Sequence, residues 1–552
     1  MINKTPLQTT GRFWTVSFAL LFLNCAPFAW ADKRPNVIVI FTDDHGYGDL
    51  SCQEVLPDIR TPNIDKLAVG GVRMTNGYIT SPQCVPSRAG LLSGRYQSKF
   101  GLETNTDYVK GGLDGFGDAI TIAERLKKAG YATGMAGKWH LGKPDKISTH
   151  GFNQVFAKNA NRPGTANFDL DGKDVPLGPE STGMYHLDAC SAAASAFITR
   201  YKDQPFFFYL AYRAPHVPLD PPKKYLDRFP GEMPERRRKA LAMMSAVDDG
   251  VGQVMETLRK HDLEENTLLF FISDNGAPLK IHKEDKPGGG PGWDGSLNDP
   301  LNGEKGTLME GGIRTPFVVY WKNKLPAGKT YDQPVISLDV AATVNELAGL
   351  EEDAQLDGVN LMPYLTGKNQ AAPHEALYWR WSGQIAIRKG QWKYVALEDR
   401  EYLFNLDQDI SESKNLLPEN KKLAAALRAD WDKWSQTLNP PGVTDGSRAA
   451  GQQYFDWYLD GKRDIGQREP AKNAVGEDTL NNTQRKMPPE NNRQDPTRLF
   501  KQRDRNEDGF VTLEEYIGDP KNRNVPALTK RFKKLDSNGD GKLQLDELKE
   551  ST

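Results

Sequence analysis

The sequence predicts an α/β protein with a mostly parallel β-sheet, followed by a small antiparallel sheet and an all-α module. Apolar runs that a sheet would bury on both faces recur through residues 32–360, and helix-like segments separate them. Each of these runs ends on polar residues. The length of 552 residues exceeds what one hydrophobic core supports, which predicts several domains.

Four strands and two helices define the predicted parallel sheet. The strands are expected at Asn36–Thr42, Tyr131–Ala136, Pro205–Tyr212 and Thr267–Ser273, and the helices include Ile120–Ala129 and Arg238–Lys260. In open α/β sheets, ligands bind beyond the carboxyl ends of the strands. The polar residues after the four strands are therefore expected to form one site, and they are Asp43 and Asp44, Lys138 to His140, His216, and Asp274 and Asn275.

Composition also sets the expected domain boundaries. Short alternating strands with one helix at Asn420–Trp434 predict a small second domain, and Trp379, Trp381 and Trp392 are interpreted first as its core. A segment rich in Pro, Gly, Asn, Gln and charge predicts a linker, which is expected to pack partly on the preceding domains around Tyr454–Tyr458. The expected divisions are 1–31, 32–360 (α/β), 361–440 (small sheet), 441–495 (linker) and 496–552 (terminal module).

The first 31 residues are typical of an export signal. Lys4 and Arg12 precede an apolar stretch, and Ala29-Trp30-Ala31 offers a small-residue cleavage site. A retained membrane anchor is the alternative, but the apolar stretch is short for a spanning helix. We therefore expect an exported protein, periplasmic or secreted, with no membrane span after cleavage.

Charge and cysteine content exclude some classes of function. Lys and Arg number 71 and Asp and Glu 73, so no basic excess indicates a nucleic-acid partner. The three cysteines outside the signal are too few for a disulfide framework. A bridge between Cys52 and Cys190 stays open, and Cys84 is then the odd thiol. The basic run Arg236–Lys239 is interpreted as a solvated helix face, with a border for an anionic polymer as the alternative.

Two calcium-binding loops are predicted in the terminal module. Oxygen-bearing residues recur at the ligand positions of an EF-hand, and a glycine permits the sharp turn in each loop. Two copies are typical of a paired EF-hand, in which Val511 and Leu543 are expected to pair across the loops. The expected ligands are Asp504, Asn506, Asp508, Phe510, Thr512 and Glu515, and then Asp536, Asn538, Asp540, Lys542, Gln544 and Glu547.

The segment from Cys84 to Arg95 carries the sharpest motif. A helix-forming stretch opens around Pro86, so the Cys84 side chain is expected at a helix N-terminus, where backbone N–H groups favour an anion. Arg88 adds a fixed positive charge one turn later. The pattern predicts a nucleophile that faces an oxyanion, whereas a lone cysteine would more simply be structural.

The same segment resembles the sulfatase signature C-x-P-S-R-x-x-x-x-x-G-R at every fixed position. Residues 130–142 are similar to the second signature of that family, and the strand-end segments and residues 303–316 resemble further family segments. The resemblance covers roughly residues 34–440. It implies the alkaline-phosphatase-like sulfatase fold with a smaller C-terminal antiparallel sheet, and an activity like that of arylsulfatases and N-acetylgalactosamine sulfatases.

The resemblance also implies the chemistry of the nucleophile. Cys84 is expected to be oxidised to formylglycine by a separate formylglycine-generating enzyme. One hydroxyl of the hydrated aldehyde attacks sulfur and the alcohol leaves; loss of the second hydroxyl's proton then expels sulfate and restores the aldehyde. Arg88 and Lys138 are expected to stabilise this diol, and His140 to act as base. His216 and Lys305 are expected to hold the sulfate oxygens, and either one protonates the leaving oxygen.

Hard oxygen ligands at the strand ends predict Ca²⁺ or Mg²⁺ rather than zinc, and these ligands are Asp43, Asp44, Asp274 and Asn275. A turn or a helix cap is the alternative for the acid pair alone. The resemblance adds the oxidised Cys84 as a ligand and favours Ca²⁺. The ion is expected to keep the nucleophile ionised and to bind a sulfate oxygen.

Two rival functions are open at the level of the sequence. A phosphonate monoester or phosphodiester hydrolase of the same superfamily shares the fold and the formylglycine motif. A calcium-dependent protein that binds sulfated glycans without turnover would share the modules. By analogy with the family, a sulfated sugar or polysaccharide is the expected substrate, with aryl sulfates as model substrates.

Overall fold

The computed structural model describes Met1 and residues 34–105, 116, 119–156, 168–170, 173–175, 184–279, 294–440 and 445–461, together with separate residues and short segments between 504 and 544. Four parts of the sequence predictions lie outside the described residues: the expected signal peptide after Met1, Asn506, Glu547 and the expected linker after residue 461. The chain divides into two compact units, Met1–Ala474 and Val475–Thr552. Within the described part of the chain, no helix combines the length and the apolar character needed to cross a bilayer.

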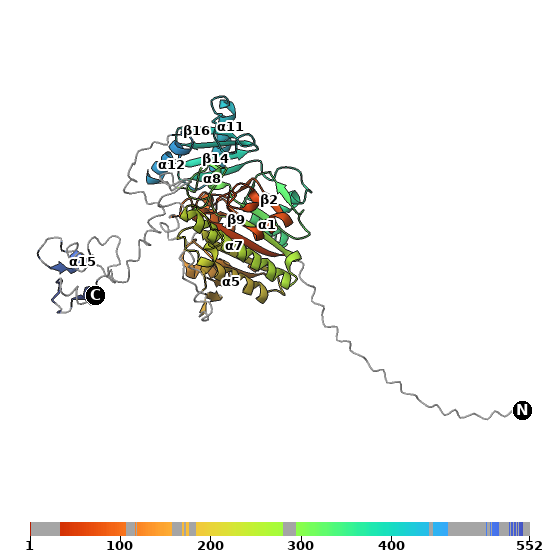
Figure 1. Cartoon of the computed structure of the whole chain (residues 1–552), viewed down its shortest axis with the longest axis horizontal. Coiled ribbons are helices and arrows are strands. Elements are labelled where there is room, and N and C mark those ends of the chain that lie inside the picture. The colour runs from red at the N-terminus through yellow and green to blue at the C-terminus, as the bar shows by residue number, and fades with distance from the viewer. Residues whose placement is uncertain are drawn as a thin grey trace. The chain divides into compact units, whose positions relative to one another are not determined.

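Ten of the described strands form one central sheet (Figure 1). In spatial order they are β11 (Lys329–Tyr331), β2 (Val72–Met74), β10 (Phe317–Tyr320), β9 (Thr267–Ser273), β1 (Asn36–Asp43), β8 (Phe206–Pro215), β4 (Ala132–Gly137), β5 (Gln154–Phe156), β6 (Phe168–Leu170) and β7 (Lys173–Val175). The strands β9, β1, β8, β4 and β5 are parallel, which confirms the predicted sheet. The antiparallel pairing of β10 and of β6 and β7 was not predicted.

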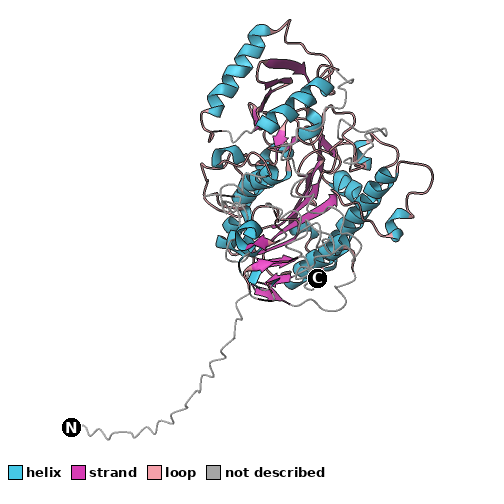
Figure 2. Ribbon diagram, turned by 90° about the vertical axis from the view of Figure 1, so that its left-hand side faces the viewer, coloured by secondary structure: helices cyan, strands magenta, loops and turns pink. Residues whose placement is uncertain are grey.

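Helices cover both faces of this sheet (Figure 2). Val39 and Phe41 of β1 face a core shared with α2 (Cys84–Ser93) and α9 (Asp339–Leu347). Ile38 and Ile40 face a core shared with α5 (His186–Arg200) and α7 (Glu235–Lys260). Burial on both faces explains the unbroken apolar run Val37–Phe41 within β1. The other described α-helices that precede the small sheet are α1 (Pro62–Gly70), α4 (Ile122–Lys128), α6 (Lys223–Leu226), α8 (Glu310–Ile313) and α10 (Met362–Leu365).

The predicted small sheet is also present. Its antiparallel strands are β13 (Leu377–Trp381), β14 (Gln384–Lys389), β15 (Trp392–Leu397) and β16 (Arg400–Asn405), and α11 (Lys421–Ser435) packs on it. Trp379 and Trp381 are buried, as expected of core residues, and Trp392 is half-buried. Residues 445–458, within the expected linker, form α12 (Asp445–Tyr458). A second small pair joins β3 (Gly77–Tyr78) to β12 (Val335–Ile336).

The C-terminal unit contains the predicted contact between the two expected calcium-binding loops. Val511 of β17 (Val511–Thr512) lies opposite Leu543 of β18 (Lys542–Leu543), which confirms the expected pairing. Both residues are buried with Tyr516 of α15 (Leu513–Ile517) and with Phe532.

The first unit tests two interpretations of the sequence, one of the basic run Arg236–Lys239 and one of the cysteines. Arg237 is not solvated: its side chain is only 3% exposed because it pairs with Asp49 and Asp58, so the interpretation of the whole basic run as a solvated face was wrong. Cys52 and Cys190 are both free thiols, so the bridge that the sequence left open is not formed.

Candidate active site

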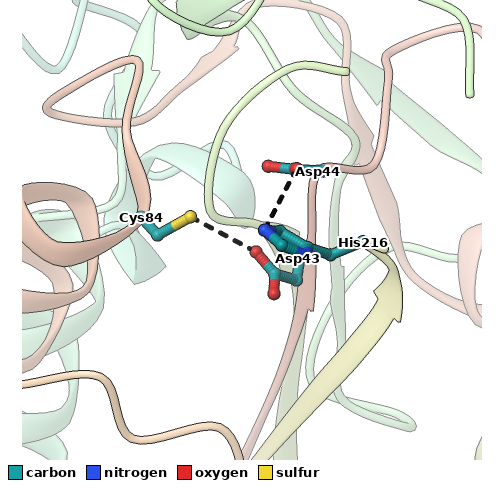
Figure 3. A group of neighbouring side chains, drawn as sticks. All are labelled: Asp43, Asp44, Cys84 and His216. Atoms are coloured by element: carbon teal, nitrogen blue, oxygen red, sulfur yellow. Dashed lines mark hydrogen bonds and ion pairs between the residues drawn. The ribbon is translucent and has the colours of Figure 1, made fainter. Parts of the chain in front are cut away.

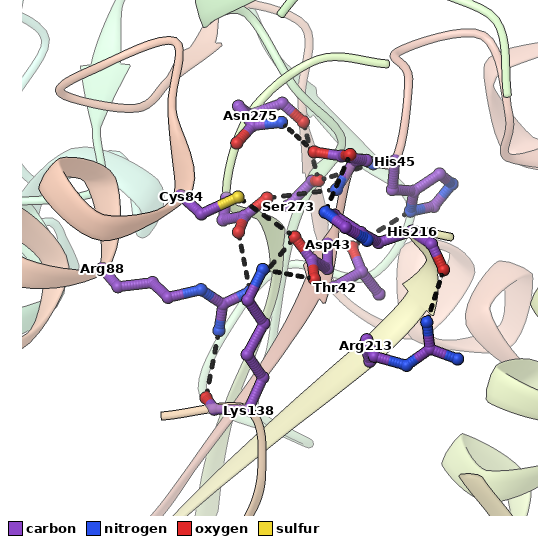
Figure 4. Close-up of polar contacts among 12 residues, drawn as sticks. Thr42, Asp43, His45, Cys84, Arg88, Lys138, Arg213, His216, Ser273 and Asn275 are labelled. Carbon is purple, nitrogen blue, oxygen red and sulfur yellow. Dashed lines mark hydrogen bonds and ion pairs between the residues drawn. The ribbon is translucent and has the colours of Figure 1, made fainter. Parts of the chain in front are cut away.

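The strand ends meet at one edge of the sheet. The backbone N–H of His216 donates to the carbonyl oxygen of Asp43 at 3.1 Å, and the N–H of Asp274 donates to that of Thr42 at 3.1 Å. On the other side of β8, the N–H of Lys138 donates to a β8 carbonyl oxygen at 2.8 Å. The parallel register therefore brings the predicted strand-end residues into one cluster, as expected (Figure 4).

Cys84 enters this cluster as the first residue of α2 (Figure 3). The side chain is fully buried. The backbone N–H of Val85, in the first turn of the helix, donates to Asn105 Oδ1 at 2.8 Å. The Sγ atom lies 3.4 Å from Asp43 Oδ1 and 3.3 Å from Lys305 Nζ. The predicted position at a helix N-terminus is thus observed, with a carboxylate and an ammonium group directly against the sulfur.

Three buried carboxylates in the site are matched by three buried cations. Lys138 Nζ lies 2.7 Å from Asp43, and Lys305 Nζ lies 2.8 Å from Asp44. Arg88 lies 2.6 Å from Asp274 and 3.6 Å from Asp43. Removing any one of these charges would take away the nearest opposite charge of its partner in a low dielectric, which is costly.

These charges shift the acidity of the site. Burial alone would raise the pKa of Asp43, but Lys138, His216 and Arg88 outweigh it and hold that pKa well below its ordinary value. Burial, together with the neighbouring negative charge of Asp43, raises the pKa of Asp274 to about 7 despite Arg88. Burial, with Asp274, also raises the pKa of the Cys84 thiol well above its ordinary value, so the site does not favour a thiolate.

The donor set fits a hard divalent cation. Ligand atoms of Asp43, Asp44, Cys84 and His216 all lie within 4.8 Å of one another. Asn275 Nδ2 donates to Asp44 Oδ1 at 2.6 Å, while its buried Oδ1 has no hydrogen-bond partner. A buried amide oxygen without a partner beside carboxylates is what an oxygen-ligated ion requires.

The two histidines differ in how they are held. His216 Nδ1 lies 2.7 Å from the carbonyl oxygen of Val217, which assigns its proton to Nδ1 and turns Nε2 toward Asp44 at 3.6 Å. Burial lowers the pKa of His216 despite the nearby carboxylates. His140 has a backbone φ of 61°, and burial together with Lys138 lowers its pKa well below the ordinary value. Both rings therefore favour the neutral form.

Sequence reasoning missed a buried support behind the cluster. Arg237 Nη1 donates to both carboxylate oxygens of Asp49 at 2.8 and 2.9 Å, and Asp49 in turn accepts from Ser296 Oγ at 2.6 Å. The main-chain oxygen of Asp49 lies 2.7 Å from His45 Nε2, next to the acid pair. Asn298 then bonds both backbone groups of Ala277, just after Asn275.

The helical period of the sequence could have indicated that Arg237 is buried, because this residue stands four positions before the buried Leu241 and therefore lies on the same face of α7.

Comparison with known protein families agrees with this geometry. The sequence pattern of the family described as "Sulfatase" matches residues 35–350, and the pattern described as "N-sulphoglucosamine sulphohydrolase, C-terminal" matches residues 303–436. The chain belongs to the sulfatase family. It is accordingly a sulfuric ester hydrolase, and the pattern described as "EF hand" matches its residues 497–517 and 529–550.

Individual sulfatases show how far the similarity extends. The chain is 30% identical to the N-acetylgalactosamine-6-O-sulfatase of Bacteroides thetaiotaomicron, over 72% of this chain and 92% of that protein. It is 30% identical to the steryl-sulfatase of Homo sapiens, over 79% and 93%. The crystal structure of Ps i-CgsB in complex with k-i-k-neocarrahexaose superposes with a TM-score of 0.66 at 30% identity, over 78% of this chain and 99% of that one. The fold expected from the resemblance is confirmed.

Proposed function

We propose that this sulfatase removes sulfate from a sulfated carbohydrate, with a formylglycine made from Cys84 and a bound Ca²⁺. One observation carries the proposal: Cys84 begins a buried helix and its Sγ lies within 3.4 Å of both a carboxylate and an ammonium group. A side chain there faces the charges that a sulfate ester and a metal ion require.

The protein residues bind and orient the groups that react. Hydrated formylglycine supplies the hydroxyl nucleophile, and the ion supplies a positive charge that favours its ionised form. Asp43, Asp44, Asp274 and Asn275 would hold the ion, together with an oxygen at position 84. Lys305 Nζ, against both position 84 and Asp44, is placed to bind a sulfate oxygen.

The remaining site residues move protons and balance charge. Arg88 and Lys138 neutralise Asp274 and Asp43 and so stabilise an oxyanion at position 84. His140, neutral at working pH, acts as base for the diol. His216 presents Nε2 to the same space, and the leaving oxygen is protonated either by Lys305 or by His216 after its Nε2 has taken up a proton.

The sugar assignment is supported by the names of the relatives. One acts on N-acetylgalactosamine 6-sulfate by its name, and the structure of another, at 30% identity, was solved with a neocarrahexaose. We further propose export to the periplasm or medium after cleavage at Ala31, and maturation by a formylglycine-generating enzyme. In this proposal the two EF-hand loops bind Ca²⁺ through the ligands expected from the sequence.

The test measures sulfate release by the full chain made with and without a maturing enzyme. The substrates are N-acetylgalactosamine 6-sulfate, a neocarrahexaose and 4-nitrophenyl sulfate, with bis(4-nitrophenyl) phosphate and a phenyl phosphonate ester as rivals. Cys84→Ala should abolish sulfate release, whereas Cys190→Ala, which alters an equally buried thiol outside the site, should retain it. Faster turnover of the phosphorus esters would favour the phosphodiester rival, and glycan binding without release would favour the binding protein.

A further inference from the structure

Helix α12 reaches the loop that carries Lys305. The helix lies beyond residue 436, where the family's C-terminal pattern ends. Tyr458 Oη donates to Glu304 Oε1 at 2.9 Å, and Asn302 Nδ2 donates to the carbonyl oxygen of Tyr458 at 3.2 Å. Two residues of the active-site loop therefore hold the C-terminal end of α12 against it.

The same helix is anchored to the small sheet. Phe455 is fully buried, with its ring 5.6 Å from the ring of Tyr402. Arg400 of β16 pairs with Asp456 at 3.1 Å and with Asp460 at 2.9 Å. With contacts on two sides, α12 presents its remaining side chains in one orientation, which reduces the entropy lost when a ligand binds them.

Tyr454 lies at the junction of the two segments that supply Cys84 and Lys305. Gly306, directly after Lys305, donates its N–H to a carbonyl oxygen two residues before Cys84, at 3.0 Å. A Cβ on Gly306 would lie 3.5 Å from the ring of Tyr454 and 3.5 Å from that of Trp381. The two aromatic rings therefore cover the backbone that joins the nucleophile segment to the sulfate-facing cation.

The two rings differ in exposure. Trp381 is 9% exposed and its Nε1 donates to Gln83 Oε1, beside Cys84, at 3.4 Å. Tyr454 is half-buried, and its ring lies nearly parallel to that of Tyr458, at 19° with 6.4 Å between centroids. A half-buried ring that stacks on Tyr458 next to the Lys305 loop suits the apolar face of a sugar, because ligand sites combine aromatic walls with a few polar groups.

We propose that Tyr454 forms a wall of the saccharide subsite and packs on the sugar ring whose sulfate reaches position 84. Trp381 and Tyr458 support it. The inference rests on the proposed function, in which the substrate is a sulfated carbohydrate. It adds a recognition element from a helix outside the residues that the family patterns match.

Kinetics of three variants test this assignment. Tyr454→Ala removes the ring, Tyr454→Phe keeps it, and Tyr201→Ala removes a half-buried tyrosine at the end of α5 as a matched control. With the sulfated saccharide that the wild type hydrolyses, Tyr454→Ala should raise KM roughly tenfold, as loss of one aromatic contact predicts, with kcat nearly unchanged. Tyr454→Phe and Tyr201→Ala should behave as wild type.

Inorganic sulfate separates a sugar contact from a structural role. It competes at the sulfate site without a sugar, so its inhibition of Tyr454→Ala should equal that of wild type. An unchanged KM, or inhibition weakened by the same factor as KM, would overturn the inference, since the helix would then only position Lys305. If the wild type releases no sulfate, the proposed function fails; saccharide binding, followed by tryptophan fluorescence, still decides whether Tyr454 contacts the sugar.

Discussion

Arg237 is predicted to be the charge whose loss most destabilises the support behind the active site. Replacing it with methionine keeps the apolar stem but leaves Asp49, 1% exposed, without its cation. Breaking a buried ion pair from one side costs about 3–5 kcal/mol. Asp58 is 34% exposed and adds little, because water screens its charge. We therefore expect a loss of about 3–4 kcal/mol in the free energy of unfolding.

Urea unfolding, followed by tryptophan fluorescence and circular dichroism, measures this loss. Lys239→Met is the matched control on the same helix, since its pair with Glu235 is 3.7 Å long and exposed, and it should change stability by no more than about 0.5 kcal/mol. Arg237→Lys should recover part of the loss by restoring the charge. A value for Arg237→Met within about 1 kcal/mol of the control would refute the argument that Asp49 depends on this partner.

Three further predictions concern separate parts of the molecule. Gly137→Ala should lower both stability and sulfate release, because Gly137 has φ of 100° and a Cβ would lie 1.9 Å from a carbonyl oxygen of β8; wild-type melting and kcat would contradict this. Burial alone lowers the pKa of His374, but Asp339, 2.8 Å away, raises it above the ordinary value. The pair therefore stabilises fully below about pH 6.5 and loses its effect as pH rises through the folded pKa, so His374→Gln should lower the urea midpoint more at about pH 6 than at about pH 9, and equal losses would argue against it. Chelation with EDTA should abolish sulfate release, and added Ca²⁺ should restore it. The combined Asp504→Asn and Asp536→Asn variant is altered only in the C-terminal unit and should stay active. Loss of activity in that variant would contradict the assignment of the catalytic ion to the active site.

The strand ends could be predicted from the sequence because their signal is local. A run buried on both faces has a clear composition, and parallel pairing then fixes which residues share an edge, as with Asp43, His216 and Asp274. Cys84 was predictable for a similar reason, since its motif and the helix it begins are continuous in the chain.

The supporting contacts could not be predicted because they join distant segments. The helical period places Arg237 on the face of α7 that carries the buried Leu241, but the sequence does not show that Asp49 lies there to pair with it, because the two residues are 188 positions apart. The helix α12 could not be predicted because its segment has the composition of a linker. Phe455 of this helix is buried because it packs on the small sheet. Tertiary burial overrides composition in both places.

The central claim is that Cys84 becomes the nucleophile of a sulfate ester hydrolase. Its most direct test is the mass of the peptide that contains Cys84, from protein made with and without a formylglycine-generating enzyme, measured alongside sulfate release from the same samples. We predict that the sulfur is replaced by an aldehyde oxygen only with the partner, and that sulfate release rises in proportion to the converted fraction. A peptide that keeps its thiol in a sample that releases sulfate, or a fully converted sample that releases none from any substrate of the panel, would contradict the account.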